Sequence, residues 1–88
     1  MNWAYRFDDR ALKELKKLDR DARVAIIACL DERVTGNVDP RQFGKALKAN
    51  LSGLWRYRVG DFRILCQIKD QELVVLVVAV GHRKDIYN

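Results

Sequence analysis

Histidine, proline and cysteine are scarce in this sequence, and long apolar runs are missing. There is one His, one Pro and two Cys, and no eighteen consecutive residues are apolar. A membrane-spanning helix needs such a run, and a signal peptide needs a basic start and an apolar stretch, which residues 1–7 lack. We therefore expect one soluble cytoplasmic domain over residues 1–88, with no contact with a membrane.

Few residues are available to bind a metal or a cofactor. A single His argues against a Cys/His zinc site, and Cys29 and Cys66 are expected to be buried, reduced thiols rather than a disulfide. A glycine-rich nucleotide loop, a Ser/His/Asp series and internal repeats are also missing. We expect no metal and no cofactor, so any chemistry must come from Arg, Tyr, His and Lys.

Charge is distributed unevenly along the chain. Residues 1–40 hold eight Lys/Arg and eight Asp/Glu, whereas residues 41–88 hold nine Lys/Arg and four Asp/Glu, so the net charge of +5 lies in the second half. A basic half indicates a nucleic acid or an acidic partner. A solvated surface with a positive bias is the alternative.

The stretch from Leu54 to Lys69 predicts a β-hairpin with Gly60-Asp61 as a two-residue turn, because Gly supplies the positive φ that such a turn needs. Counting from the turn pairs Val59 with Phe62, Arg58 with Arg63, Tyr57 with Ile64, Arg56 with Leu65 and Trp55 with Cys66. Alternation then separates an apolar face from a face that carries three arginines.

The arginine face holds Arg56, Arg58 and Arg63. Like charges directly opposite across antiparallel strands are destabilising, so stability alone does not favour Arg58 facing Arg63. We expect this face to bind an anion, and we expect Ala in place of Arg58 or Arg63 to leave stability unchanged or slightly improved.

The first forty residues predict a strand and two helices. Alternation over Asn2–Phe7 predicts a strand with Trp3, Tyr5 and Phe7 facing inward. Asp8 or Asp9 is expected to cap a first helix that reaches about Leu18, and Asp19 a second that stops near Gly36-Asn37. The expected buried positions are Ala11, Leu12, Leu15 and Leu18 in the first helix and Val24, Ile27, Ala28, Leu30 and Val34 in and after the second.

The last apolar run, Leu73–Val80, predicts a buried strand that follows a turn at Asp70-Gln71, whereas residues 38–53 are compatible with a helical turn or an irregular strand. The predicted fold is α+β: an N-terminal strand, a two-helix hairpin and a three-stranded antiparallel meander, with the helices on one face of the sheet. Val74, Leu76 and Val78 are expected to be exposed on the arginine face, where a partner would cover them. The alternative is that the loop at residues 38–53 folds over them.

A polar cluster follows the last strand. Gly81 lets the chain leave the sheet, which brings His82, Arg83 and Tyr87 within reach of the arginine face. Taken singly, His82, Arg83 and Tyr87 could each be an ordinary surface residue or a residue that packs against the body of the protein. Because they are expected to lie beside three arginines, a role in binding or catalysis is favoured for these residues.

The segments FDDRALKELKKL, GLWRYRVGDFRIL and VGHRKDIY, together with the order of elements, resemble the RelE branch of the RelE/ParE toxin superfamily over essentially the whole chain. The resemblance implies a RelE-like toxin that cuts mRNA in the ribosomal A site without a metal and is neutralised by an antitoxin. ParE-type members share the fold and act on DNA gyrase instead.

The resemblance also implies roles for particular residues. Arg56 and Arg58 stand where RelE toxins usually have two lysines, and Arg63, Arg83 and Tyr87 stand where they have two arginines and a tyrosine. We expect the catalytic set to be Arg58, Arg63, Arg83, Tyr87 and His82, and the RNA-binding set to be Arg56, Lys45, Lys48 and Lys84. Arg stays protonated, so neither Arg56 nor Arg58 is suited to act as a general base, although both bind phosphate well. His82 is the candidate for proton transfer because its unperturbed pKa lies near neutrality.

The expected partners are the ribosome, mRNA and an acidic, partly disordered antitoxin that folds onto Val74, Leu76 and Val78. Operator DNA would be bound only through the antitoxin complex. Two other functions remain open at this point: a gyrase inhibitor that cuts no RNA, and a degenerate member that only binds its antitoxin.

Overall fold

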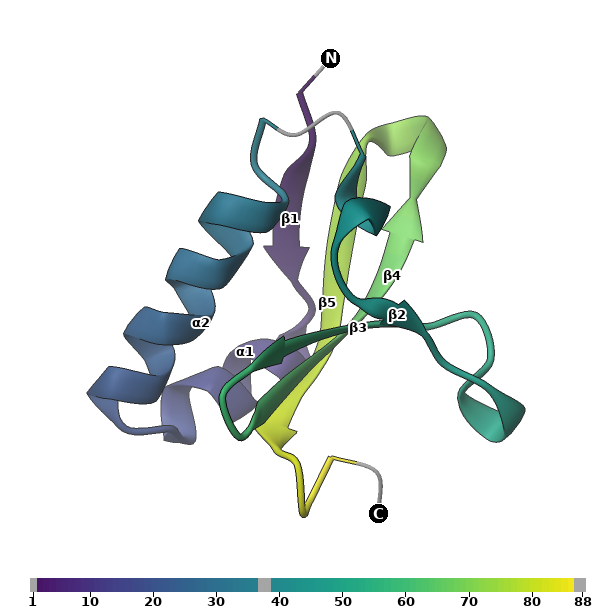
Figure 1. Ribbon diagram of the computed structural model, residues 1–88. Helices are drawn as coiled ribbons and strands as arrows, with labels where there is room; N and C mark the ends of the chain where they lie inside the picture. The colour runs from purple at the N-terminus through teal and green to yellow at the C-terminus, as the bar shows by residue number, and fades with distance from the viewer. Residues whose placement is uncertain (1, 37–38, 87–88) are drawn as a thin grey trace.

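The computed structural model describes residues 2–36 and 39–86, which form two helices and a five-stranded mixed sheet (Figure 1). The strands are β1 (Ala4–Phe7), β2 (Lys45–Ala46), β3 (Trp55–Val59), β4 (Phe62–Lys69) and β5 (Val74–His82); the helices are α1 (Asp9–Lys17) and α2 (Arg20–Arg33); three 3-10 turns are η1 (Pro40–Gln42), η2 (Ala49–Leu51) and η3 (Asp70–Glu72). The order across the sheet is β1-β5-β4-β3-β2. The predicted α+β class is confirmed.

The β3–β4 hairpin has the register that was counted from its turn. Arg58 pairs with Arg63 and Trp55 pairs with Cys66, and Gly60 has φ of 57°. The apolar face of the hairpin supplies Tyr57, Ile64 and Cys66 to the core, each with no exposed surface. Because side chains alternate across a strand, a single count from one turn placed this whole face correctly.

Two pairings complete the sheet. β1 lies parallel to β5, with Ala4 opposite Val74 and Phe7 opposite Val77, so the chain's first strand joins its last. β2 is the strand that the sequence left undecided, and it pairs antiparallel with β3 through Lys45 and Arg56. This pairing brings a cation of the 38–53 segment directly beside the arginines of β3.

Both helices begin at the expected aspartates. The Asp8 carboxylate accepts a hydrogen bond from the Ala11 N–H, and the Asp19 carboxylate accepts one from the Ala22 N–H, each at 2.8 Å. Such side-chain caps satisfy amide groups that have no partner within the helix. The caps explain why α1 and α2 start where they do.

The predicted buried positions of the helices were partly wrong. Val24 is 57% exposed and Leu12 38% exposed, and Ala28 is also exposed. The buried residues of α2 are Ala22, Ile26, Cys29 and Leu30, a stripe turned away from the predicted one. The sequence of α2 is apolar on more than one side, because Val24, Ile27 and Ala28 also follow helical spacing, so spacing alone did not select the correct face.

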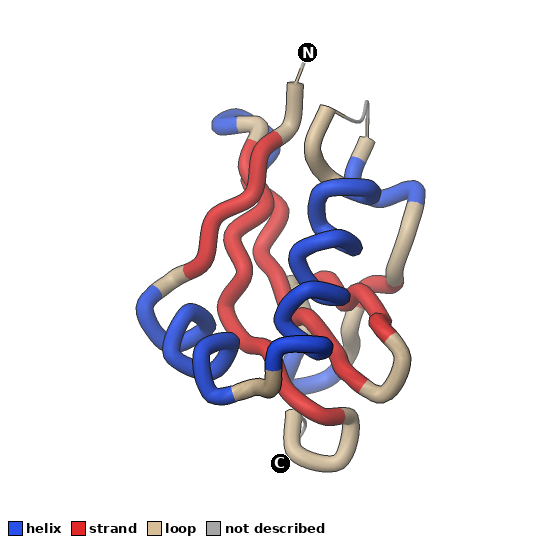
Figure 2. The backbone as a smooth tube through the Cα atoms, turned by 90° about the vertical axis from the view of Figure 1, so that its left-hand side faces the viewer, coloured by secondary structure: helices blue, strands red, loops and turns tan. Residues whose placement is uncertain are grey.

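Figure 2 shows that both helices lie on the same side of the sheet, as predicted. The core between the two layers joins Ala11 and Leu15 of α1 with Ile26 and Leu30 of α2, and these pack against the central strands. A further link is the Val80 N–H, which donates to the Glu14 carboxylate at 3.0 Å. None of the helices in the described part of the chain is long and apolar enough to cross a membrane.

The other side of the sheet is partly covered by the chain itself. Val74, Leu76 and Val78 are half-buried rather than exposed, which corrects the prediction. Val78 is the extra residue of a bulge opposite Leu65 and Cys66, and it lines a hollow of about 460 Å³ with residues 50, 51 and 54 of the preceding loop. The alternative prediction, that the loop at residues 38–53 folds over this face of the sheet, is therefore correct at Val78, which this loop partly covers.

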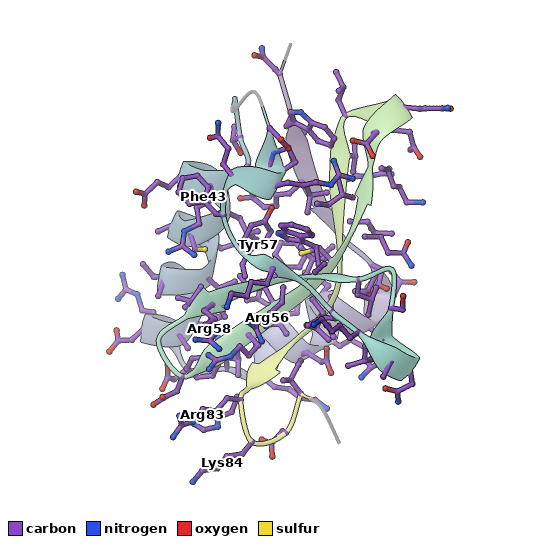
Figure 3. All side chains as sticks on the ribbon, turned by 45° about the vertical axis from the view of Figure 1, so that its right-hand side comes forward. Phe43, Arg56, Tyr57, Arg58, Arg83 and Lys84 are labelled. Carbon is purple, nitrogen blue, oxygen red and sulfur yellow. The ribbon has the colours of Figure 1, made fainter. Side chains whose placement is uncertain are left out.

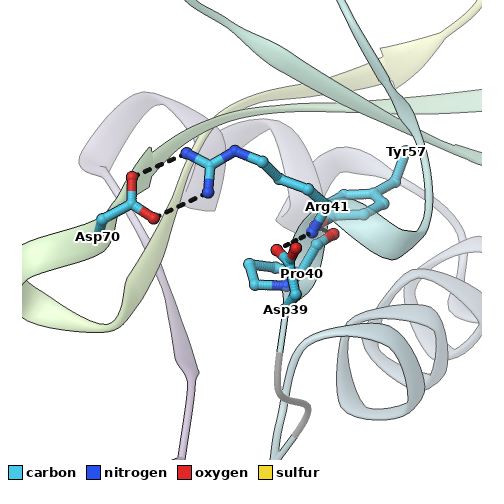
Figure 4. A network of polar contacts seen from close by, with 5 residues as sticks. All are labelled: Asp39, Pro40, Arg41, Tyr57 and Asp70. Atoms are coloured by element: carbon cyan, nitrogen blue, oxygen red, sulfur yellow. Dashed lines mark hydrogen bonds and ion pairs between the residues drawn. The ribbon is translucent and has the colours of Figure 1, made fainter.

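The loop before β3 is fastened to its surroundings at two points and is capped by a bond within itself (Figure 4). Both terminal nitrogens of Arg41 donate to the Asp70 carboxylate at 2.8 Å, and the Asp39 carboxylate accepts from the Arg41 N–H at 2.9 Å. The buried Tyr57 hydroxyl donates to the Pro40 carbonyl at 2.7 Å. These bonds hold the start of the loop against the sheet and so fix the approach to β2.

The two cysteines are free and buried, as expected. Burial raises the pKa of the Cys66 thiol, and it raises the pKa of Cys29 as well. Because the thiolate is the reactive form, both side chains act as small apolar core residues.

Candidate functional site

Cations from three elements surround one hollow at the β2 edge of the sheet. The hollow has a volume of about 190 Å³ and is lined by Arg33, Gly44, Lys45, Arg56 and Arg58. We call these five residues the cationic hollow. Arg58 and Lys45 are exposed, and Arg33 and Arg56 are half-buried. Figure 3 shows the side chains of Arg56 and Arg58 leaving the same strand, so β3 forms the floor from which two of the four cations project.

Arg33 was not identified from the sequence, because it is the last residue of α2 and far from the hairpin in the chain. Its guanidinium donates to the Arg58 carbonyl oxygen at 3.0 Å and lies 5.7 Å from the centre of the Phe43 ring. Helix α2 thus contributes a fourth cation to a site built mainly on β2 and β3. Only the packing of α2 against the sheet brings it there.

Gly44 permits the close approach of the loop to β3. It has φ of 82°, and a Cβ at this position would collide with the Arg56 carbonyl oxygen and the Trp55 indole nitrogen. The Trp55 indole N–H also donates to the Phe43 carbonyl at 2.8 Å. The cationic hollow is therefore held by backbone contacts on its loop side.

Arg63 differs from the prediction. Although it pairs with Arg58, it is only 8% exposed, and its guanidinium donates to the carbonyl oxygens of Gly60 and Phe62, each at 2.9 Å. Its charge is used to hold the hairpin turn. The expectation of an exposed Arg63 that does not support the fold was wrong, and Arg63 does not line the cationic hollow.

Arg83 is tied to the same turn from the other side. Its backbone N–H donates to the Asp61 carbonyl at 2.7 Å, and its guanidinium lies 3.8 Å from the Asp61 carboxylate. The Arg83 side chain remains 57% exposed. In Figure 3, Arg83 and Lys84 lie below Arg58, on the segment that leaves β5. The hairpin turn is thus the element that links Arg83 to β3. The chain does not leave the sheet at Gly81 as expected, because β5 continues to His82 and Gly81 pairs with Arg63.

His82 lies toward α1. It pairs with Phe62, whose neighbours Ile64 and Cys66 on the same face are in the core, and the two rings meet edge to face at 5.7 Å. Its Nδ1 accepts a hydrogen bond from the Lys84 N–H at 3.2 Å. The residues that line the space around His82 include Arg10, Glu14 and Lys17 of α1, so this side chain is separate from the cationic hollow. The expectation that His82 lies within reach of the arginine face was wrong.

Two other predicted residues do not join this group. Lys48 is exposed directly before η2 and does not line the cationic hollow. Tyr87 lies outside the described residues. Within residues 2–36 and 39–86, no three His, Cys, Asp or Glu side chains gather closely enough to hold a metal ion.

Comparison with known proteins gives the chain its relatives. Residues 5–87 match the family model described as "ParE toxin of type II toxin-antitoxin system, parDE". The chain is 34% identical to toxin RelG of Mycobacterium tuberculosis, over 99% of this chain and 98% of that protein. It is 31% identical to a putative RelE-like toxin protein of Escherichia coli, over 100% of this chain and 93% of that protein.

Solved structures agree with these relatives. The toxin–antitoxin complex RelBE2 of Mycobacterium tuberculosis contains a chain that superposes with a TM-score of 0.84 at 28% identity, covering 97% of this chain and 95% of the other. The overall fold is therefore similar to that of a chain in a solved toxin–antitoxin complex.

Proposed function

We infer a mechanism from the following premise: this chain belongs to the ParE toxin family, within the RelE/ParE superfamily, and is a toxin of a type II toxin–antitoxin system. The proposed activity is endonucleolytic cleavage of mRNA on the ribosome, which inhibits translation. The main support for this proposal is the group of cations around the cationic hollow. Among the described residues, no carboxylate lies within ion-pairing distance of Arg33, Lys45 or Arg58. Four cations around one space suit a phosphate chain.

In the proposed reaction the RNA supplies its own nucleophile. The 2′-oxygen bonds to the adjacent phosphorus and the bond from phosphorus to the 5′-oxygen breaks, which leaves a 2′,3′-cyclic phosphate and a 5′-hydroxyl. One proton leaves the 2′-hydroxyl and one is added to the 5′-oxygen. The extra negative charge on the phosphate in the transition state is what preorganised cations stabilise.

The arginines divide this work. Arg58 and Arg83 are exposed cations on two sides of the hairpin turn, and we assign them to the reacting phosphate. Lys45 and Arg56 hold the neighbouring backbone, with Lys48 and Lys84 as outer contacts. Arg63 supports the turn between Arg58 and Arg83, so its contribution to catalysis is to position the other two.

Proton transfer is assigned to the segment after β5. Neither Arg56 nor Arg58 loses a proton readily. Tyr87 stays the proposed proton-transfer group, whereas the bond from Lys84 N–H to Nδ1 and the packing on Phe62 assign His82 to positioning the segment that carries Arg83. To accept a proton on Nδ1, His82 must first give up this hydrogen bond.

We also propose an antitoxin partner, since the similar structure of RelBE2 is a toxin–antitoxin complex. An acidic, partly disordered chain that folds on binding would complement the charge of +5 and cover Val74, Leu76 and Val78. The complex would act in the cytoplasm and contact operator DNA only through the antitoxin. Mixing the two proteins should give a species much larger than 10.2 kDa, with Arg58 and Arg83 less accessible than in the toxin alone.

Primer extension on a translated mRNA after induction tests the activity. New 5′-ends should appear within the reading frame and should disappear when initiation on that mRNA is blocked. Growth arrest with intact mRNA would remove the proposal.

Inhibition of DNA gyrase is the second candidate, because the matching family model is that of ParE toxins. A supercoiling assay with purified protein separates the two activities. Loss of supercoiling without RNA cleavage would establish the second, and harmless expression of the soluble toxin alone would exclude both.

A further inference from the structure

Phe43 is an exposed aromatic ring beside the cationic hollow. It is 40% exposed, and among the described residues the other exposed large apolar side chains are Leu12 and Val24, neither of which is aromatic. Phe43 is adjacent to Gly44 in the chain, and the guanidinium of Arg33 lies 5.7 Å from the centre of its ring. An aromatic surface therefore continues directly from a group of cations.

The ring is held in place from its backbone. The Phe43 carbonyl accepts the Trp55 indole N–H at 2.8 Å, and the close approach of Gly44 to the Arg56 carbonyl leaves no space for the loop to move inward. On its other side, Arg33 is fixed by its bond to the Arg58 carbonyl at 3.0 Å. The backbone that carries the ring, and the Arg33 side chain, therefore have little conformational freedom to lose when a ligand binds, which favours binding.

Packing within the protein does not account for this arrangement. A cation above an exposed ring contributes little to stability, and the ring keeps much of its surface in water although burial would favour the fold. Aromatic rings next to backbone-binding cations are the usual means of binding single-stranded nucleic acid, since each base has a face that can stack while the cations hold the phosphates.

We propose that Phe43, supported by Arg33, is a base-stacking subsite for single-stranded RNA whose phosphates are held by Lys45, Arg56 and Arg58. This inference rests on the proposed function and adds a specific contact to it. The two parts adjoin, because Arg33 both lies over the Phe43 ring and lines the cationic hollow, so one strand can contact both. A duplex hides its base faces and would gain nothing from Phe43.

Binding measured apart from cleavage tests the subsite. The probe is a short fluorescent oligoribonucleotide with 2′-O-methyl groups, which remove the attacking hydroxyl, and it is titrated with the full chain at low salt by anisotropy. Phe43→Leu keeps the backbone bond to Trp55 and should weaken binding by about 5- to 150-fold, the range typical of one stacked base. Phe43→Trp should bind as tightly as the wild type or more tightly. Val24→Ala, which changes an exposed apolar residue on α2, should bind like the wild type.

An abasic probe of the same length separates stacking from charge. If Phe43 stacks on a base, Phe43→Leu should change the affinity for the abasic probe by less than twofold. Equal losses on both probes would overturn the subsite while the phosphate site, and with it the proposed function, stands. A wild-type chain that binds neither probe would overturn both.

The competing occupant is an acidic peptide. A peptide with the same number of negative charges should displace the probe, but its own affinity should not depend on Phe43. If Phe43→Leu weakens peptide binding as much as RNA binding, the surface is a peptide site and the inference is wrong.

Discussion

Arg58 and Arg63 are directly paired across the β3–β4 hairpin, yet their guanidinium groups serve different purposes. Arg58 is exposed and lines the cationic hollow, whereas Arg63 is 8% exposed and donates to the carbonyls of Gly60 and Phe62. The repulsion expected between paired cations is reduced because one of them is turned into the hairpin bend. Of these two paired arginines, Arg63 therefore supports the fold and Arg58 is available to a ligand.

The first prediction separates these two roles. Arg63→Ala removes a charged donor from two carbonyls and should lower the free energy of unfolding by about 1–3 kcal/mol. Arg58→Ala should change stability by less than about 0.5 kcal/mol but reduce cleavage per folded molecule by about 10²–10³-fold. Urea unfolding and cleavage are measured on the same preparations. Equal stability losses in the two variants would mean that the division is wrong.

Sequence reasoning succeeded where one local feature fixes many positions. A single glycine turn determined every pair in the hairpin, and Asp8 and Asp19 determined where the helices begin. Turns and caps depend on neighbouring residues alone, so a short stretch of sequence carries all the information.

The site was predicted less completely, because its members meet only after folding. Arg33 and Phe43 come from α2 and the loop, and nothing in the local pattern of either connects it with Arg58. The burial of Arg63 was also missed, since alternation tells which face a side chain leaves but not whether a long side chain then bends back. The proline at position 40 and the glycine at 44 were the available signals that the loop is ordered.

The second prediction concerns the corrected face of α2. Ile26 has no exposed surface, so Ile26→Ala should cost about 2–5 kcal/mol through the cavity it leaves. Val24 is 57% exposed, and Val24→Ala should change stability by less than about 0.5 kcal/mol. Denaturant unfolding of the two variants gives the comparison. A larger loss for Val24→Ala would restore the face that the spacing first suggested.

The third prediction is an acid-dependent contribution from the Arg41–Asp70 pair. The hydrogen bonds from Arg41 lower the pKa of Asp70, so the carboxylate binds its proton less readily in the folded chain than in the unfolded chain. A lowered pKa stabilises the fold above the unfolded value and loses this effect as the pH falls through the folded value. Asp70→Asn should therefore lower the melting temperature at pH 7, and its difference from the wild type should shrink below about pH 4. A difference that stays constant down to strongly acidic pH would contradict the pairing.

The fourth prediction lies at alkaline pH. Burial, followed by the hydrogen bond to Asp31, raises the pKa of Tyr5 to about 12. A raised pKa stabilises the fold below the unfolded value, about 10, and this stabilisation is lost as the pH rises through 12. Absorbance of the phenolate, compared between the wild type and Tyr5→Phe, isolates this group. Because burial is the larger cause, Asp31→Asn should lower the Tyr5 pKa only part of the way, and full restoration to 10 would show that the hydrogen bond dominates.

The fifth prediction concerns whether His82 transfers a proton or only positions its neighbours. Its Nδ1 already accepts the Lys84 N–H, and its ring packs on Phe62, so the geometry favours a side chain that fixes the segment carrying Arg83 over one that exchanges protons. Asn can offer an oxygen near the position of Nδ1 but cannot shuttle a proton near neutral pH. We therefore expect His82→Asn to cleave within about threefold of the wild type and to keep the shape of the pH–rate profile, while His82→Ala loses about tenfold, the effect of a weakened hydrogen bond that is worth about 1.4 kcal/mol. If instead both variants fall by about 10²–10⁴-fold and one limb of the profile disappears, His82 is the proton-transfer group and the Lys84 contact breaks during the reaction.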